Sequence, residues 1–204
     1  MFVKRFQSIP GISTTLFLLV KQAISAKIGG MLEESEILRL DSSSTPSDEL
    51  LHKVAQLFQR NYPTMHDQEE REEDIGLRNS SEKLRELLKG KVLRVARDSR
   101  QQVIGVLESC EVDAGDFIYA LLIWLIVDEK ARGQKVSSKL HNVFEEEIEA
   151  RRTETGKEFV QLLNVHEANS ARQVYERWGY VVIPPKPKRP HKLFMAKEKA
   201  SAAN

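Results

Sequence analysis

Residues 125–140 read LIVDEKARGQKVSSKL and contain, in order, the end of an apolar run, a polar turn with one glycine, and the start of an amphipathic segment. The apolar run, Phe117–Val127, is nearly continuous, which is typical of a central strand covered on both faces. The amphipathic segment has helical spacing and predicts a helix that starts at 132–134 and ends near Arg151. A buried strand that leads directly into a helix therefore decides the fold at this point of the chain.

The start of that helix is a candidate anion site. The first backbone N–H groups of a helix have no partner within it, and the helix dipole places positive charge at the same end. Arg132 and Lys135 would add to this charge, so the junction suits the phosphate groups of a nucleotide-type cofactor. Because every helix has such an end, a simple solvated helix start is the alternative interpretation.

Apolar periodicity along the rest of the chain predicts an α/β order. Besides 117–127, alternating or continuous apolar runs predict strands at 36–40, 91–97, 102–110, 159–165, 180–183 and 192–196. Helical spacing predicts further helices at 47–60, 80–88 and 169–178, the second with a serine N-cap and the last stopped by Gly179. The order is strand, two helices, three strands, helix, strand, helix and two strands.

Composition excludes several classes of protein. The chain has 204 residues, 41% of them hydrophobic, which is enough for one globular domain with a substantial core. Its single cysteine, Cys110, excludes a disulfide scaffold and a cysteine-rich zinc module, and we expect no metal. The 31 basic and 30 acidic residues nearly balance, so nucleic acid is not an expected partner. No apolar run approaches the roughly 20 residues that span a bilayer, so no membrane span is expected.

The first thirty residues form a separate compositional segment. Residues 1–30 contain four basic residues and no acid, whereas acids follow at once after Met31. This extension is interpreted as a mitochondrial presequence, a secretory signal, or an upstream extension of a chain whose working start is Met31. We therefore expect a domain at 31–198 and a frayed tail at 199–204. The expected location is the cytoplasm, or the mitochondrial matrix if the extension is a presequence.

Two segments resemble motifs of the Gcn5-related N-acetyltransferases, the GNAT superfamily. Residues 125–140 are similar to its motif A, in which a strand is followed by arginine or glutamine, two residues, glycine, any residue, and glycine or alanine. Residues 166–180, HEANSARQVYERWGY, are similar to its later pattern of asparagine, alanine, tyrosine and a closing glycine with an aromatic residue. The resemblance covers about 36–197, and the element order predicted above is the family's order.

The resemblance implies both a fold and an activity. The fold would be a mixed, mostly antiparallel twisted sheet of six to seven strands flanked by about four helices. The activity would be that of an acyltransferase that moves the acetyl group of acetyl-CoA directly to a primary amine of a small molecule or protein, with Tyr175 as general acid. By similarity, acetyl-CoA would contact Leu125, Ile126 and Val127 on the strand, Arg132, Gly133, Gln134, Lys135, Val136, Ser137 and Ser138 at the helix start, and Asn169.

The sequence departs from the family's motifs at three positions. Lys135 stands where the family has glycine, and Ser137 where it has glycine or alanine, so side chains would lie close to the pyrophosphate. Asn169 is six residues before Tyr175 instead of seven. These departures favour a second hypothesis, a non-catalytic acyltransferase fold that binds CoA or a protein.

The base and the acceptor amine stay open. The strand 117–127 contains no acid, so the candidates for a general base are a water molecule and the side chains of Glu108, Glu111, Asp116, His166 and Glu167. The acidic run 67–74 would attract cationic amines, whereas the basic loop 184–191 would favour an anionic acceptor. A homodimer is also allowed.

Overall fold

One mixed sheet organises the computed structural model, which describes residues 35–61, 76–184 and 191–197. Its seven strands pair in the order β1-β2-β3-β4-β5-β7-β6, and every pair is antiparallel except β4 with β5. The strands are β1 (Glu36–Leu40), β2 (Val92–Arg97), β3 (Val103–Asp113), β4 (Phe117–Val127), β5 (Glu158–His166), β6 (Val181–Val182) and β7 (Lys192–Lys197). The predicted mixed, mostly antiparallel sheet of six to seven strands is confirmed.

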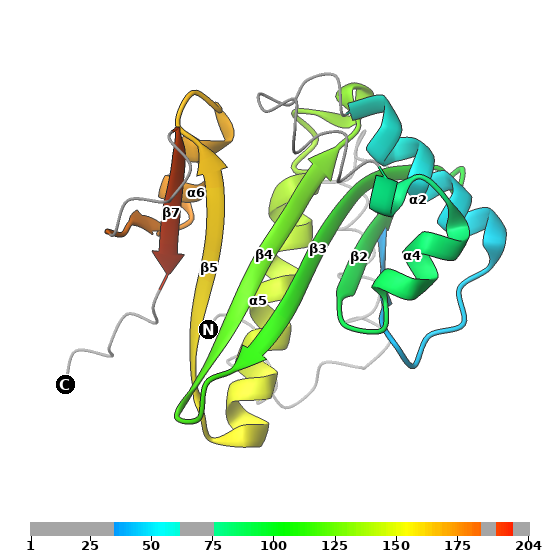
Figure 1. Ribbon diagram of the computed structural model, residues 1–204. Coiled ribbons are helices and arrows are strands. Elements are labelled where there is room, and N and C mark those ends of the chain that lie inside the picture. Colours follow the sequence, from blue (N-terminus) through cyan, green and yellow to red (C-terminus); the bar gives the residue numbers. More distant parts are fainter. Residues whose placement is uncertain (1–34, 62–75, 185–190, 198–204) are drawn as a thin grey trace, which may run out of the picture. The chain divides into compact units, whose positions relative to one another are not determined.

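Helices cover both faces of this sheet (Figure 1). They are α2 (Asp48–Asn61), α4 (Ser81–Leu87), the 3-10 turn η3 (Glu129–Ala131), α5 (Val136–Thr155) and α6 (Ala171–Arg177). On one face, α2 and α4 pack with β2 and β3 around residues such as Phe58 and Leu93. On the other face, Leu140 and Phe144 of α5 and Tyr175 of α6 share a second apolar cluster with β4 and β5. The sheet therefore separates two cores.

The predicted element boundaries agree with the structure to within two residues except at β3, which ends at Asp113 instead of 110, and at α5, which ends at Thr155 instead of near Arg151. This helix begins at Val136, not at 132–134, because Gly133 and Lys135 have positive φ angles of 80° and 61° and form a turn. The predicted caps are present: the Ser80 side chain accepts a hydrogen bond from the Lys83 N–H at the start of α4, and Gly179, with φ of 89°, follows α6.

β4 is bent where it leaves β5. Its pairing with β3 skips Ile123, which has no partner residue, and such a bulge bends a strand and increases its twist. The parallel pairing with β5 ends at the same place, with Leu122 opposite Leu163. Figure 1 shows the two strands side by side at their amino ends and apart at their carboxyl ends. The backbone of 123–127 therefore has no strand partner on its β5 side.

A buried ion cluster joins the α2–α4 layer to the sheet. Glu108 of β3 is fully buried and accepts hydrogen bonds at 2.7 and 2.8 Å from the guanidinium of Arg78, which is 1% exposed. The Lys91 ammonium donates to the same carboxylate at 2.8 Å. The Arg78 guanidinium also lies 5.6 and 5.7 Å from the ring centres of Phe58 and Trp124.

Several predictions fall outside the described residues. These are the extension at 1–30, the acidic run at 67–74, most of the basic loop at 184–191, and the tail at 199–204. Within the described part of the chain, no helix is long and apolar enough to cross a membrane.

Candidate active site

The turn between β4 and α5 carries the predicted anion site. Along 35–61, 76–184 and 191–197, the structure provides no hydrogen-bond acceptor for the N–H groups of Gly133 and of residues 135–138. Gln134 differs, because its N–H bonds the Ala131 carbonyl at 3.3 Å and its amide bonds the Lys130 carbonyl at 3.1 Å. Five free donors at the positive end of a twenty-residue helix form an arrangement that binds phosphate.

Positive charge surrounds these donors. Lys130, Arg132 and Lys135 are exposed, and none of them pairs with an acid in the described part of the chain. Asp128, at the end of β4, is instead paired with Arg60 at 2.8 Å. Lys135 caps α5 in the left-handed conformation that glycine adopts most easily, which explains why a glycine is expected there.

The divergence of β4 from β5 supplies the second part of the site. Leu125, Ile126 and Val127 pair with β3 on one side only. Buried peptide groups require hydrogen-bond partners, so an amide-containing chain between the two strands would satisfy them. This backbone leads directly into the turn with the five free N–H groups.

Tyr175 projects from α6 into the cluster on the α5 face. It is 8% exposed, and burial raises the pKa of its phenol to about 12. Its hydroxyl has no hydrogen-bond partner among the described residues. The fully buried side-chain atoms that lack a partner there are the Nε atoms of Arg94, Arg97 and Arg152, so the Tyr175 hydroxyl is not fully buried. The hydroxyl therefore touches accessible space as a protonated, unengaged phenol.

Aromatic and polar contacts fix the position of α6. The Tyr175 ring meets Trp178 and Tyr180 edge-on, with ring centres 5.8 and 6.0 Å apart. Trp178 stacks on the buried His141 of α5 at 4.1 Å, and the His141 Nε2 lies 3.2 Å from the Tyr180 hydroxyl. That hydroxyl donates to Gln161 of β5 at 2.6 Å. Tyr175 thus packs against two aromatic rings, and contacts with α5 and β5 fix the positions of these rings.

Asn169 has a local role in the structure. Its Oδ1 accepts a hydrogen bond at 2.9 Å from the Ala171 N–H, the first residue of α6. Such a bond closes an Asx turn just before the N-cap residue of α6, Ser170. Ser137 and Ser138 lie half-buried in the first turn of α5, where their N–H groups are among the free donors.

The candidate bases lie in different places. Glu108 is buried beneath Arg78 and Lys91, as described above. Glu111 faces α5, where it lies 3.6 Å from Arg151, and Asp116 lies in the turn at the amino end of β4. His166 and Glu167 lie at the carboxyl end of β5, where the structure adds a group that the sequence analysis did not select: the Nδ1 of His191 is 2.7 Å from a Glu167 carboxylate oxygen.

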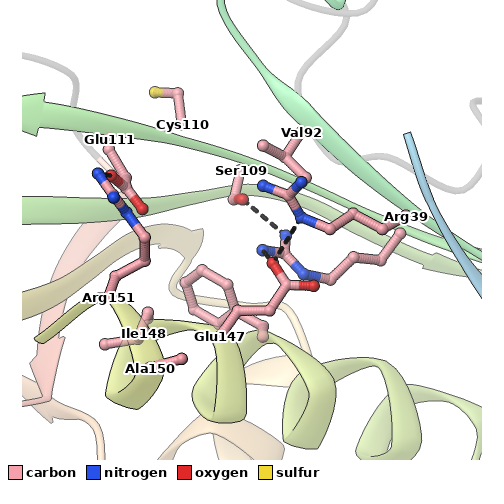
Figure 2. A pocket seen from close by; sticks show the side chains of 11 residues that line it. Arg39, Val92, Ser109, Cys110, Glu111, Glu147, Ile148, Ala150 and Arg151 are labelled. Atoms are coloured by element: carbon pink, nitrogen blue, oxygen red, sulfur yellow. Dashed lines mark hydrogen bonds and ion pairs between the residues drawn. The ribbon is translucent and has the colours of Figure 1, made fainter. Parts of the chain in front are cut away.

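A cavity of about 190 Å³ lies elsewhere, between β1–β3 and the second half of α5. Glu147 of α5 forms ion pairs with Arg39 of β1 and with Arg94 of β2, and Figure 2 shows the side chains that line this cavity. Arg94 also donates to Ser109 at 2.7 Å. Beside this cavity, burial raises the pKa of the Cys110 thiol, which opposes a role as nucleophile.

Comparison with known proteins gives the family of this fold. Residues 89–182 match the family described as the acetyltransferase (GNAT) domain. No curated protein matches the chain significantly in sequence.

Solved structures are similar over most of the chain. The PaiA N-acetyltransferase of Thermoplasma acidophilum, in complex with coenzyme A, has a TM-score of 0.60 and 21% identity over 81% of this chain and 99% of that one. Aminoglycoside 6'-acetyltransferase type Ii has a TM-score of 0.60 and 19% identity over 80% and 96%. An aminoglycoside acetyltransferase from an uncultured soil metagenomic sample, in complex with sisomicin, has a TM-score of 0.54 and 17% identity over 76% and 93%.

These likenesses show a shared fold over most of the chain, and the junction with the free N–H groups of Gly133 and 135–138 lies inside the matched family region. Residues 89–182 of this chain are therefore a GNAT acetyltransferase domain.

Proposed function

We propose that this protein transfers the acetyl group of acetyl-CoA to a primary amine of a small molecule or protein. The proposal rests on the five N–H groups at Gly133 and 135–138 that lack a partner within the described ranges. They follow the part of the β4 backbone that pairs with β3 but not with β5. A pyrophosphate would accept from the N–H groups, and the amide-containing pantetheine arm would pair with 125–127. One junction thus offers complementary partners to both parts of CoA.

The departures from the motif are compatible with this binding. Lys135 keeps the left-handed backbone of a glycine, so the turn retains its shape despite the larger side chain. An exposed ammonium beside the N–H groups adds an attraction for phosphate. Both points favour CoA binding at this junction, which the proposed transfer requires.

Acetyl transfer requires a neutral amine, a polarised thioester carbonyl and a proton for the leaving thiolate. A backbone N–H near Val127 would polarise the carbonyl. The Tyr175 phenol, whose pKa of about 12 keeps it protonated at neutral pH, would give its proton to the thiolate as the C–S bond breaks. Its hydroxyl is available because it has no partner in the described structure.

Calorimetric titration of acetyl-CoA into the full-length chain tests the first part, with NAD and ATP as control ligands. Selective binding of acetyl-CoA is expected. Thiol release is then measured with a panel of primary amines: a polyamine, a lysine-containing peptide and an aminoglycoside. Binding without thiol release from any amine would favour the non-catalytic alternative, and absence of binding would contradict the site itself.

A further inference from the structure

The proposed reaction also needs a base, because an alkyl amine is protonated at neutral pH and cannot attack as an ammonium ion. The buried Glu108 carboxylate is engaged on both oxygens by Arg78 and Lys91. Glu111 is on the α5 face near Arg151, and Asp116 is at the far end of β4. Glu108 pairs with Trp124 near the carboxyl end of β4, but its carboxylate is occupied by these two cations. Glu111 and Asp116 do not lie at the carboxyl ends of β4 and β5.

The His191–Glu167 pair does lie there. Pairing of β5 with β7 places His191 beside Glu167, and the Glu167 N–H donates to the His191 carbonyl at 2.7 Å. The side chains meet again, with the imidazole Nδ1 2.7 Å from the carboxylate. This hydrogen bond lowers the pKa of Glu167, so the carboxylate is ionised at neutral pH.

Hydrogen bonding decides which imidazole can accept a proton. An ionised carboxylate only accepts, so the Nδ1 of His191 carries the hydrogen and its Nε2 keeps a lone pair. In His166 the Nδ1 accepts from the Ala168 N–H at 3.2 Å, which places the hydrogen of the neutral ring on Nε2. His191 is therefore set as a base, whereas His166 presents a donor.

The pair also has a suitable position. β5 continues to His166, three residues beyond its last pairing with β4 at Leu163, or about 10 Å at the usual rise per residue. Since Leu163 and Val165 face the α5 cluster, the alternation of the strand turns His166 to the other face, and the His191 ring stacks against it at 5.8 Å. Tyr175 thus lies on the α5 face of the sheet, and the His166 and His191 rings lie on the other face, beyond the last pairing of β5 with β4.

The backbone of His191 is constrained as well. Its φ is 74°, a left-handed value that is uncommon for a residue other than glycine, and such conformations cluster at functional sites. The 63% exposure of the side chain leaves Nε2 open to an acceptor molecule.

We propose that His191, oriented by Glu167, is the general base of the acetyl transfer; this inference rests on the proposed function. The Nε2 of His191 takes a proton from the ammonium of the acceptor, directly or through one water. The neutral nitrogen then forms a bond to the thioester carbon, the C–S bond breaks, and Tyr175 protonates the thiolate. The second proton of the nitrogen leaves as the amide forms and restores the Tyr175 phenol.

The test compares pH profiles of kcat/KM for the wild type, His191→Gln and His166→Gln, with the amine that supports the fastest thiol release. Besides Glu167, the groups near His191 are the His166 ring, Lys192 of β7 and Arg172 of α6, which acts on Glu167. His191→Gln is expected to lose about 100-fold at neutral pH and to recover as the pH approaches about 10, where an alkyl amine deprotonates by itself. The matched His166→Gln variant removes the ring stacked on His191, and any loss of kcat/KM in this variant is expected to be equal at every pH.

Further measurements distinguish a general base from a residue that only maintains the structure of the site. Acetyl-CoA affinity is expected to be equal in all variants, and Glu167→Gln should lose about tenfold with the same recovery at high pH, as a positioning residue would. A His191→Gln variant with the wild-type profile, or one equally impaired at every pH, would overturn the assignment of His191 while leaving acetyl transfer intact. A wild type that binds acetyl-CoA without acetylating any amine would overturn the proposed function and this base together.

Discussion

Replacement of Lys135 by glycine tests the left-handed turn at the start of α5. A residue with a side chain costs about 1–2 kcal/mol in the left-handed conformation, which Lys135 adopts at φ of 61°. Glycine avoids this cost, but it lowers the free energy of unfolding by about 0.5–1 kcal/mol because it has more conformational entropy in the unfolded chain than a residue with a side chain. Lys135→Gly should therefore stabilise the fold by about 0.5–1 kcal/mol, which corresponds to a rise in Tm of about 1–4 °C for a chain of this size.

Thermal unfolding followed by circular dichroism measures the effect, with Lys135→Ala as the matched control. Alanine removes the same charged side chain and keeps the Cβ atom that makes the conformation unfavourable. The glycine variant should therefore melt above both the wild type and the alanine variant. An alanine variant at least as stable as the glycine variant would refute the left-handed turn.

The same two variants report on the side chain. Both lose the ammonium beside the free N–H groups, so both should bind acetyl-CoA severalfold more weakly at low salt, with a smaller difference at high salt. Tighter binding by the glycine variant alone would instead mean that the Cβ of Lys135 limits the approach of the pyrophosphate.

Three further predictions concern other parts of the fold. Tyr175→Phe should lower kcat about tenfold to a thousandfold without changing acetyl-CoA affinity in a calorimetric titration, and equal turnover would remove Tyr175 from the chemistry. Arg78→Met leaves the buried Glu108 charge without its main partner and should destabilise the fold by about 3–5 kcal/mol, or about 10 °C in Tm, most of which the double variant with Glu108→Leu should restore. Burial lowers the pKa of His141 to about 4 in the folded protein. As the pH falls, the imidazole is therefore protonated in the unfolded chain before it is protonated in the folded one. Stability should therefore decline between about pH 6.5 and 4 by up to about 3 kcal/mol, and chemical denaturation of His141→Gln should show a flatter dependence in that range.

The order of elements was predictable because periodicity depends only on local sequence. The continuous apolar run of β4 and the heptad-like spacing in α5 locate the central junction without any tertiary information. Tyr175 was selected from the resemblance to a family motif, and its role as general acid stays a prediction. The position at which α5 begins was missed by a few residues, because a lysine gives no sign that its backbone is left-handed.

Contacts between distant residues could not be predicted. Arg78 and Glu108 look like solvated surface charges in the sequence, and only the tertiary fold brings Arg78, which lies just before α4, against Glu108 of β3 in the core. Glu167 and His191 are 24 residues apart and meet because β5 pairs with β7. The bulge at Ile123 depends on the register between β3 and β4, which no pattern within β4 encodes.

The unpaired Ile123 also has a consequence for sequence change in β4. Side chains alternate between the faces of a strand, and one extra residue shifts this alternation by one step. Leu122 and Leu125 consequently face the same cluster although they are three residues apart, and Trp124 faces the other. Deletion of Ile123 would therefore leave every residue from 124 to 127 on its present face, because Leu122 and Trp124 already pair with the consecutive residues Ser109 and Glu108. A deletion elsewhere between 124 and 127 would instead shift the residues beyond it to the opposite face, whereas the half that pairs with β5 would keep its own.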